Sequence, residues 1–360
     1  MKKKVLVGMS GGIDSSVAAL LLKRDGYEVE GITMLIWRPD SPYPAPMSVN
    51  SCYNPNKGNE IGEIEEICNK IGIKHHVVDC SELYESTVLE NFRSEYMNAR
   101  TPNPCIWCNS KIKFGAMVDR AREMFDFDYF ATGHYARIEK GENGRYQLLK
   151  AVDLKKDQSY FLSRLSQAQL ETTLFPLGSF YKSQIREIDV EYEFHEPGQS
   201  ESQDFYGGDY TDLLSVSDKE GEIVLYPEGK VLGKHKGYWH YTIGQRKGLG
   251  IAYSEPLFVL SLDAANNKVF VGTVEYVKKN RVFASNVNWV GEEGFERDKV
   301  YSAKIRSTSP GDSVMASVTN GGIVLDFLSP VKAVTPGQSA VVYDGDRVIA
   351  SAVIENSESE

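Results

Sequence analysis

The first half of the chain alternates short apolar runs with longer stretches in which apolar residues recur every three to four positions. The short runs predict buried strands, and the periodic stretches predict helices with one apolar face. We expect strands at 4–9, 29–36, 73–78 and 129–131, and helices at 15–24, 61–71, 82–99 and 111–125. Such alternation indicates an α/β domain with a parallel sheet, which binds ligands at the carboxyl ends of its strands.

The pattern changes after about residue 205, where glycine and β-branched residues become frequent and helical periodicity fades. The turn sequences Asn-Gly-Gly at 320–322 and Asp-Gly-Asp at 344–346 predict hairpins. Strands are expected at 269–274, 300–305, 313–318, 323–327, 339–343 and 348–353. We therefore divide the chain into an α/β domain at 1–205, a small central domain at 206–278 and a C-terminal β-barrel at 279–356.

One segment of the first domain, 39–58, fits neither pattern because it is rich in Pro, Ser and Asn. Structureless segments of this length are uncommon inside compact domains and often carry function. We expect a mobile functional loop here.

The amino-acid composition limits the classes of function open to this chain. The 360 residues include 40 Lys and Arg and 50 Asp and Glu, a formal net charge of −10, which argues against nucleic-acid binding by overall charge alone. Charge is uneven, however: 100–122 has a net charge of +4 and 229–248 one of +5, the latter with interleaved aromatic residues. Such segments suit phosphate contact and base stacking, or are ordinary solvated loops. No apolar stretch has the length of a membrane span, and the odd count of five cysteines indicates a reducing compartment, hence a cytoplasmic protein.

The first candidate site is the segment Ser10-Gly11-Gly12-Ile13-Asp14-Ser15-Ser16, between the first strand and the first helix. Backbone N–H groups at such a junction bind anions, and the two glycines allow positive φ and close approach of phosphate oxygens. No Gly-Lys-Ser/Thr follows, so this is not a Walker A loop. Ser15 or Ser16 is expected to cap the helix and bond a phosphate, and Asp14 to hold Mg²⁺. The alternative is a plain glycine turn before a capped helix.

A second candidate site is the pair Cys105 and Cys108, which follows the segment 101–104 with its two prolines. The prolines favour an extended loop, with Asn109 or Ser110 capping the next helix. A thiol at a helix N-terminus has a depressed pKa, and two nearby lysines are expected to lower it further. The spacing suits sulfur transfer, reversible disulfide formation or metal ligation.

The other cysteines limit the metal sites open to this pair. A closed zinc site needs about four ligands, usually from two such pairs, and the chain has one CxxC. An iron–sulfur cluster held by Cys105, Cys108 and one further cysteine stays open. We expect Cys68, on an apolar helix face, in the core and Cys80, at a strand end, to be structural, whereas Cys52 in the long loop receives no role.

The glycine segment resembles the PP-loop of the ATP pyrophosphatase superfamily, which holds pyrophosphate while AMP is transferred. Together with the cysteine pair, it gives the chain a resemblance to the tRNA-specific 2-thiouridylase family that covers nearly the whole length. Further segments match that family in order, at 131–137, 156–162, 174–178, 201–204, 241–250 and 336–338. Several motifs in one order are far more specific than any one of them.

The resemblance implies an ATP pyrophosphatase fold for the first domain and synthesis of 2-thiouridine at the wobble position of tRNA. The family adenylates the uracil C2 oxygen with ATP and then replaces the AMP leaving group with sulfur from a cysteine persulfide. The implied cofactors are ATP and Mg²⁺, with a [4Fe–4S] cluster as a further option. The implied partners are tRNA and a sulfur donor, either a persulfide carrier protein or inorganic sulfide, and we expect a monomer or weak dimer without membrane association.

The resemblance also assigns roles to residues. Cys108 matches the first catalytic cysteine, with Cys105 and Asp14 as further catalytic candidates. Residues expected to bind ATP are Gly8, Met9, Ser10, Gly11, Gly12, Asp14, Ser15, Ser16, Met34 and Gly133. Residues expected to meet tRNA are Asn103, Pro104, Cys105, His134, Lys156, Asp157, Gln158, Arg306, Ser307 and Gln338. For 156–158, a turn before a capped helix is the alternative interpretation.

The chain departs from the family at one position. The family usually places its second catalytic cysteine two residues after the Glu-Ser-Gln-Asp motif, where this chain has Tyr206, and no cysteine follows Cys108. Three hypotheses stay open. Cys108 carries sulfur and Cys105 resolves it as a disulfide, or the pair anchors a cluster that delivers inorganic sulfide, or thiolation has been lost and tRNA or ATP binding kept. A superfamily enzyme that joins an amine to an adenylated carboxylate or amide is a further rival, although an amine acceptor needs no thiol.

Overall fold

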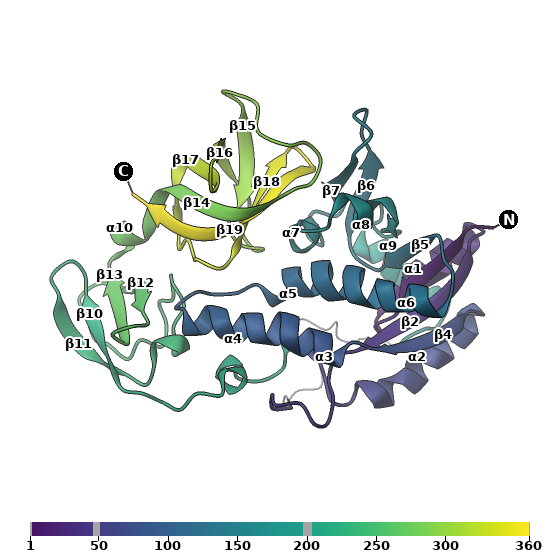
Figure 1. Ribbon diagram of the computed structural model, residues 1–360, viewed down its shortest axis with the longest axis horizontal. Coiled ribbons are helices and arrows are strands. Elements are labelled where there is room, and N and C mark those ends of the chain that lie inside the picture. Colours follow the sequence, from purple (N-terminus) through teal and green to yellow (C-terminus); the bar gives the residue numbers. More distant parts are fainter. Residues whose placement is uncertain (1, 46–50, 197–203, 360) are drawn as a thin grey trace.

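The computed structural model describes residues 2–45, 51–196 and 204–359 (Figure 1). The first domain is built on a parallel sheet with the strand order β4-β2-β1-β5-β8. Its strands are β1 (Lys4–Gly8), β2 (Glu28–Leu35), β4 (Lys74–Asp79), β5 (Tyr129–Thr132) and β8 (Thr173–Leu174). The predicted α/β class and the four predicted strands of this domain are confirmed. The strand order reverses between β1 and β5, so the loops after these two strands meet at a topological switch point.

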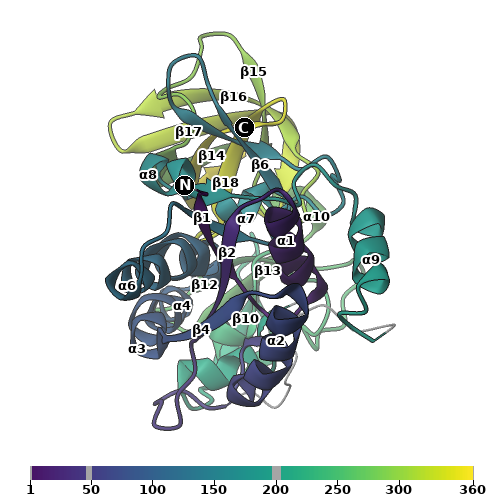
Figure 2. The same ribbon diagram turned by 90° about the vertical axis from the view of Figure 1, so that its right-hand side faces the viewer.

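Helices cover both faces of this sheet (Figure 2). One face packs on α1 (Ile13–Arg24), α2 (Lys57–Ile71) and α9 (Lys182–Glu191). The other packs on α3 (Ser81–Tyr84), η1 (Glu85–Leu89), α4 (Glu90–Met97), α5 (Pro104–Trp107), η2 (Cys108–Ala116) and α6 (Met117–Met124), where η1 and η2 are π-helical. Val5 and Val7 of β1 enter the first core and Leu6 the second, as a two-residue period requires. In the described part of the chain, no helix has both the length and the apolar composition that a membrane crossing requires.

Two predictions for this domain are wrong in part. The helix expected at 111–125 already begins at Pro104, because proline suits the first helical position and Asn103 caps it. The loop expected at 39–58 contains β3 (Ser51–Tyr53), which pairs in parallel with β9 (Asp204–Tyr206), and it ends where α2 begins. Positions 46–50 of that loop lie outside the described residues.

The central domain is a four-stranded sheet with the order β11-β10-β13-β12. Its strands are β10 (Gly221–Leu225), β11 (Lys230–His235), β12 (Phe258–Asp263) and β13 (Lys268–Gly272). Three short helical segments flank it, η3 (Tyr210–Leu214), η4 (Tyr238–His240) and α10 (Val274–Val277).

The C-terminal domain is a closed six-stranded barrel, as predicted. Its strands are β14 (Lys278–Trp289), β15 (Val300–Lys304), β16 (Asp312–Thr319), β17 (Gly322–Lys332), β18 (Ser339–Asp344) and β19 (Arg347–Glu358). Pairing of β14 with β19 closes the barrel, and both predicted hairpins are present, with Thr319 opposite Gly322 and Asp344 opposite Arg347. The sequence did not predict β14, whose polar residues mask its strand pattern.

A hairpin of the first domain extends the barrel sheet (Figure 1). It consists of β6 (Ala136–Lys140) and β7 (Tyr146–Lys150), and β7 pairs with β19 through Leu149 and Arg347. The short helices α7 (Ser159–Leu162) and α8 (Gln167–Glu171) follow it. Because of this hairpin, the first and last domains share one continuous sheet.

Candidate active site

The glycine loop between β1 and α1 has the geometry of an anion site. Gly11 adopts φ +82°, a conformation that favours glycine, and Gly12 is the N-cap of α1 without a side-chain cap. The first backbone N–H groups of the helix therefore remain available to a ligand. The predicted capping role of Ser15 and Ser16 is wrong: the helix begins at Ile13, and both hydroxyls donate back to the Gly12 carbonyl, at 3.0 and 3.1 Å.

Other predicted ATP residues line the same end of the sheet. Gly8 ends β1, Met9 is buried directly after it, and Ser10 packs its hydroxyl 3.2 Å from that of Ser15. Met34 lies half-buried near the carboxyl end of β2. These residues come together because adjacent parallel strands end at one edge.

Gly133, directly after β5, closes the switch point. A Cβ atom on Gly133 would lie 2.6 Å from the Asp14 carbonyl carbon and 2.8 Å from the Ser15 nitrogen. Only glycine permits this approach of the β5 loop to the start of α1. The structure thus brings Gly133 and the glycine loop together, as the resemblance implied.

Asp14 is held by two residues that the sequence analysis missed. Its Oδ1 atom lies 2.7 Å from Lys182 Nζ and accepts a hydrogen bond of 2.7 Å from the Tyr135 hydroxyl. The Lys182 side chain is only 7% exposed, so a buried ammonium stands beside the loop. Lys182 opens α9, far from the loop in sequence, and no spacing pattern connects the two. Only its position shortly after the matching segment 174–178 hinted at a role.

A buried histidine, which the sequence patterns did not identify, supports the glycine loop. His195 Nδ1 lies 2.6 Å from Asp189 Oδ1, and its Nε2 lies 3.1 Å from the Gly11 carbonyl oxygen. The ring thus bridges the Asp189 carboxylate and the Gly11 carbonyl. With both side chains at most 5% exposed, this contact fixes the position of Gly11.

The cysteine pair lies on a helix. The Asn103 side chain accepts a hydrogen bond from the Ile106 N–H, so the helix starts before the cysteines, and the predicted cap at Asn109 or Ser110 is wrong. Cys105 and Cys108 are three residues apart and therefore share one face of its first turns. Neither Asn109 nor Ser110 caps this helix: the Asn109 side chain donates to the Phe161 carbonyl, and the Ser110 hydroxyl donates to the Ile106 carbonyl.

The expected low pKa of the pair is also wrong for Cys108. Burial raises the pKa of the Cys108 thiol to about 12, and the nearby Lys113 ammonium offsets only part of this effect. At this site the free energy required to desolvate a thiolate exceeds the electrostatic stabilisation that one nearby cation supplies. Cys108 is therefore a protonated thiol in the resting protein.

Contacts connect this helix with the nucleotide end of the sheet. His134, directly after Gly133, has its ring 5.9 Å from that of Phe114 in η2 and its Nδ1 2.7 Å from the Thr132 hydroxyl. Burial lowers the pKa of His134 well below its usual value, and the Lys113 charge lowers it further. Lys113 thus lies within charge range of both Cys108 and His134.

The barrel holds the segment that precedes the cysteines. Gln338 Nε2 donates to the Thr101 and Pro102 carbonyls at 3.1 and 2.8 Å, and Thr101 N–H donates to the Pro336 carbonyl at 2.8 Å. Gly337 adopts φ +91°, and a Cβ atom there would lie 2.8 Å from the Thr101 oxygen. The 336–338 motif therefore docks against the start of the cysteine helix, where Pro104 is half-buried.

Other predicted tRNA residues also make internal contacts. Arg306 Nη2 donates to the Ile243 and Ala333 carbonyls at 2.9 and 2.7 Å, and burial lowers the pKa of this guanidinium. Arg306 thereby ties the central domain to the barrel, while the adjacent Ser307 is half-exposed.

The segment 156–158, for which tRNA contact and a turn before a capped helix were both considered, forms a turn before α7. Asp157 Oδ1 accepts hydrogen bonds from the Ser159 and Ala151 N–H groups, both at 3.1 Å, and Gln158 accepts one from Tyr135 N–H at 2.9 Å. Lys156 is half-exposed.

Basic residues of both segments form ion pairs with acidic neighbours. Arg100 pairs with Glu95 and Glu355, both at 2.7 Å, and Lys234 pairs with Glu220 at 2.6 Å. In 229–248 the side chains of His235, Tyr238 and Trp239 are buried. The interpretation of these three rings as base-stacking groups is therefore wrong.

The remaining cysteines do not complete a metal site. Cys68 is buried on α2 and Cys80 is buried against the opposite face of the sheet, as the predictions for both required. Cys52 is exposed on β3. Within 2–45, 51–196 and 204–359, no group of three or more His, Cys, Asp or Glu side chains is arranged to hold a metal ion. Among the described residues, no further side chain therefore completes a metal site with Cys105 and Cys108.

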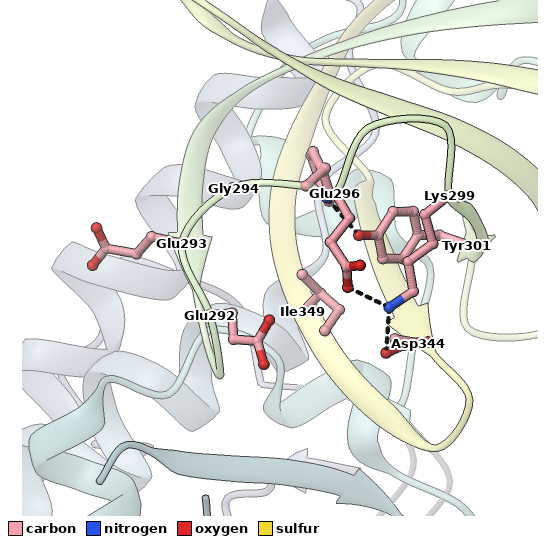
Figure 3. A pocket seen from close by; sticks show the side chains of 9 residues that line it. Glu292, Glu293, Gly294, Glu296, Lys299, Tyr301, Asp344 and Ile349 are labelled. Carbon is pink, nitrogen blue, oxygen red and sulfur yellow. Dashed lines mark hydrogen bonds and ion pairs between the residues drawn. The ribbon is translucent and has the colours of Figure 1, made fainter. Parts of the chain in front are cut away.

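A cavity of about 180 Å³ in the barrel is lined by several acidic residues (Figure 3). Lys299 points between Glu296 and Asp344 and pairs with both, at 2.6 and 3.1 Å. This arrangement is a local ion-pair network on the barrel.

Comparison with known proteins assigns the chain to a family. Three family models match in succession, namely the tRNA methyl transferase HUP domain at 3–206, the tRNA methyl transferase PRC-barrel domain at 214–273 and the aminomethyltransferase beta-barrel domain at 279–354. The chain is 43% identical to a tRNA-specific 2-thiouridylase MnmA of Endomicrobium trichonymphae over 98% of each chain. It is 40% identical to that of Clostridioides difficile over 99% of each chain, and 42% identical to one of Caldanaerobacter subterraneus over 98% of each. This chain belongs to the tRNA-specific 2-thiouridylase family.

Proposed function

We propose that this chain makes 2-thiouridine at the wobble position of tRNA, by ATP-dependent adenylation of the uracil C2 oxygen followed by sulfur transfer. One observation carries the proposal. The anion loop at the end of β1 and the cysteine helix are connected through Gly133, His134 and Lys113, so an adenylating site and a thiol site lie next to each other.

In the first half-reaction the C2 oxygen attacks the α-phosphorus of ATP and pyrophosphate leaves. The backbone N–H groups at the start of α1 would hold the departing pyrophosphate, and the Lys182 ammonium would neutralise part of its charge. Asp14 would position that ammonium, since the two groups lie 2.7 Å apart.

Mg²⁺ usually binds through one or two carboxylates together with substrate phosphates, and it neutralises phosphate charge. Asp14 is the carboxylate beside the loop, and one of its oxygens already pairs with Lys182 and Tyr135. We therefore propose Asp14 as the protein ligand of a Mg²⁺ ion that arrives with ATP.

In the second half-reaction a sulfur nucleophile attacks C2 and AMP leaves. AMP is a good leaving group, whereas the original carbonyl oxygen is a poor one. We propose Cys108 and Cys105 as the thiols next to the base, with sulfur supplied by a persulfide carrier or by inorganic sulfide. Because Cys108 is protonated at rest, it has to lose its proton before it can attack.

For tRNA we propose a surface around the cysteine helix, composed of the ten residues that match the family motifs. Asn103, Arg306 and Gln338 would act there partly by positioning the cysteine segment and the domains, because their polar atoms already have internal partners. The domain limits 1–205, 206–278 and 279–356, a cytoplasmic site of action and a monomer or weak dimer remain our expectations.

Two rivals are weaker. A tRNA-binding paralogue without thiolation is motivated by Tyr206, but the relatives at 40–43% identity are named thiouridylases. A superfamily enzyme with an amine acceptor would have no use for two thiols beside the nucleotide end.

Nucleoside mass spectrometry tests the proposal. Unmodified tRNA is incubated anaerobically with ATP, Mg²⁺ and either sulfide or cysteine persulfide, and pyrophosphate is measured in parallel. We expect 2-thiouridine and pyrophosphate with the wild-type chain, and pyrophosphate without 2-thiouridine with Cys108→Ser. If the wild-type chain makes no 2-thiouridine with either donor, the proposed function is wrong.

A further inference from the structure

The strand pair β3–β9 brings a cysteine next to the position at which the family has its second one. Tyr53 of β3 lies opposite Tyr206 of β9, and Cys52 directly precedes Tyr53. Cys52 is also the exposed member of the five cysteines. The strand pair thus brings Cys52 close to the position that lacks a cysteine, with the Cys52 side chain on the exposed face and the Tyr53 side chain buried.

Tyr206 itself cannot take over the missing chemistry. Its side chain is 2% exposed, and its ring lies 6.4 Å from that of Tyr53. Burial and the nearby Asp212 raise the pKa of the Tyr206 phenol to about 12. The residue is a neutral part of the core, and a phenol oxygen cannot carry sulfane sulfur.

The three candidate thiols border one aromatic cluster. Tyr53 stacks on the buried Tyr84, with ring centroids 5.9 Å apart and planes at 14°. Cys105 and Cys108 pack against the same core cluster that contains Tyr53 and Tyr84. Negative charge on Cys52, Cys105 or Cys108 would each raise the pKa of Tyr84, so all three lie within charge range of one ring.

Cys52 and Cys108 also lie close enough to interact electrostatically, and the two side chains differ in solvent exposure. Charge on Cys52 raises the pKa of Cys108, so the two groups lie within charge range of each other. Cys52 is exposed and open to a donor protein, whereas Cys108 is partly buried against the core.

We propose that Cys52 is the second catalytic cysteine of this chain: it receives sulfur from the donor and carries it as a persulfide, and Cys108 then resolves the intermediate. This inference rests on the proposed function. It replaces Cys105 with Cys52 as the partner of Cys108 and leaves Cys105 as a neighbour on the helix.

The chemistry balances without a metal. The Cys52 thiolate attacks the outer sulfur of a donor persulfide, the donor S–S bond breaks, and the donor leaves as a thiolate. The terminal sulfur on Cys52 attacks C2 of the adenylated uridine, and the C2–O bond breaks with AMP taking the electron pair.

Cys108 then loses its proton to water and attacks the Cys52 sulfur. The S–S bond breaks and its electron pair stays on the sulfur at C2, which gives 2-thiouridine. The two thiols end as a Cys52–Cys108 disulfide, and a dithiol reductant returns both to the thiol state.

A single-turnover assay with tRNA, ATP, Mg²⁺ and cysteine persulfide tests this assignment. We expect Cys52→Ser to lower 2-thiouridine formation by about a hundredfold or more while pyrophosphate release, which reports adenylation, stays within about threefold of wild type. Cys68→Ala, which removes a core thiol on the other face of the sheet, is the matched control and should thiolate normally. After turnover without reductant, peptide mapping of the wild-type chain should find a Cys52–Cys108 disulfide.

Three results would overturn the assignment while leaving the proposed function intact. They are wild-type thiolation by Cys52→Ser, a Cys105–Cys108 disulfide after turnover, and anaerobically bound iron with labile sulfide that is lost in Cys52→Ser. By contrast, absence of 2-thiouridine from the wild-type reaction would refute the proposed function itself.

Discussion

The nucleotide end and the thiol end of the proposed site are built in different ways. The nucleotide end consists of backbone at the carboxyl ends of β1 and β5, held by buried partners such as Lys182 and His195. The thiol end consists of side chains on a helix and on the short strand β3, which come from separate segments. The position of the loop is fixed by the strand order, whereas the thiols depend on how separate segments pack together. The nucleotide end therefore depends mainly on backbone geometry, and the thiol end depends mainly on side-chain packing.

The strongest test of the comparison is Asp14→Ala. Loss of this carboxylate leaves the buried Lys182 ammonium unpaired and removes the proposed Mg²⁺ ligand, so we expect AMP formation to fall by about a thousandfold or more. Thiolation should fall with it, because sulfur needs the adenylated base. Asp25→Ala, at the exposed C-terminal end of α1, is the control and should keep wild-type turnover.

The substitution Cys108→Ser should impair sulfur transfer at the thiol end and leave adenylation at the nucleotide end intact. We expect no measurable 2-thiouridine but pyrophosphate release within about threefold of wild type, since the thiol takes part only after adenylation. The measurement is pyrophosphate release beside nucleoside mass spectrometry. Equal loss of both products would mean that Cys108 also positions ATP, and the comparison would be wrong.

Lys182→Met tests whether the buried cation acts on the leaving group. Removing one preorganised charge typically costs about a hundredfold in rate, and we expect AMP formation to slow by about that factor. Lys182→Arg keeps the charge and should recover part of the rate, whereas Lys74→Met, a substitution at the exposed start of β4, should have no effect. An arginine variant as slow as the methionine one would indicate a purely geometric role.

His195→Ala tests the support below the glycine loop. With the contact to the Gly11 carbonyl lost, the loop is held less firmly, and we expect KM for ATP to rise by about tenfold with a smaller change in kcat. His240→Ala removes a histidine that pairs with Asp218 in the central domain and should leave KM unchanged. A wild-type KM in the His195 variant would contradict the supporting role.

The last prediction concerns the stability of the fold and the two structural thiols, which contrast with the functional ones. Burial raises the pKa of both Cys68 and Cys80 to about 11, above the usual value of 9.0. The contribution of each buried thiol to the free energy of unfolding is therefore complete below pH 9. It is lost between pH 9 and 11, at about 1.4 kcal/mol per pH unit for each thiol. Urea unfolding across this range should show a shallower decline for Cys68→Ala than for the wild-type chain.

Sequence patterns located the parts of the site that are local in the chain. The strand, the positive-φ glycine and the following helix are neighbours in sequence, so the loop at 10–16 could be predicted. Lys182 and His195 could not, because only the sheet brings α9 and its following residues to the loop. The helix start at Pro104 and the raised pKa of Cys108 also escaped prediction, since the first depends on one side-chain cap and the second on burial.

The docking of the 336–338 segment on the cysteine helix has a consequence for the order of synthesis. Thr101 and Gln338 are 237 residues apart, so the ribosome releases the cysteine helix long before its brace exists. The pairing of β7 with β19 imposes the same delay on the hairpin of the first domain. A nascent or truncated chain therefore presents its thiols without the contacts that fix them. The brace between the barrel and the cysteine helix therefore forms only after residues 336–338 have been synthesised.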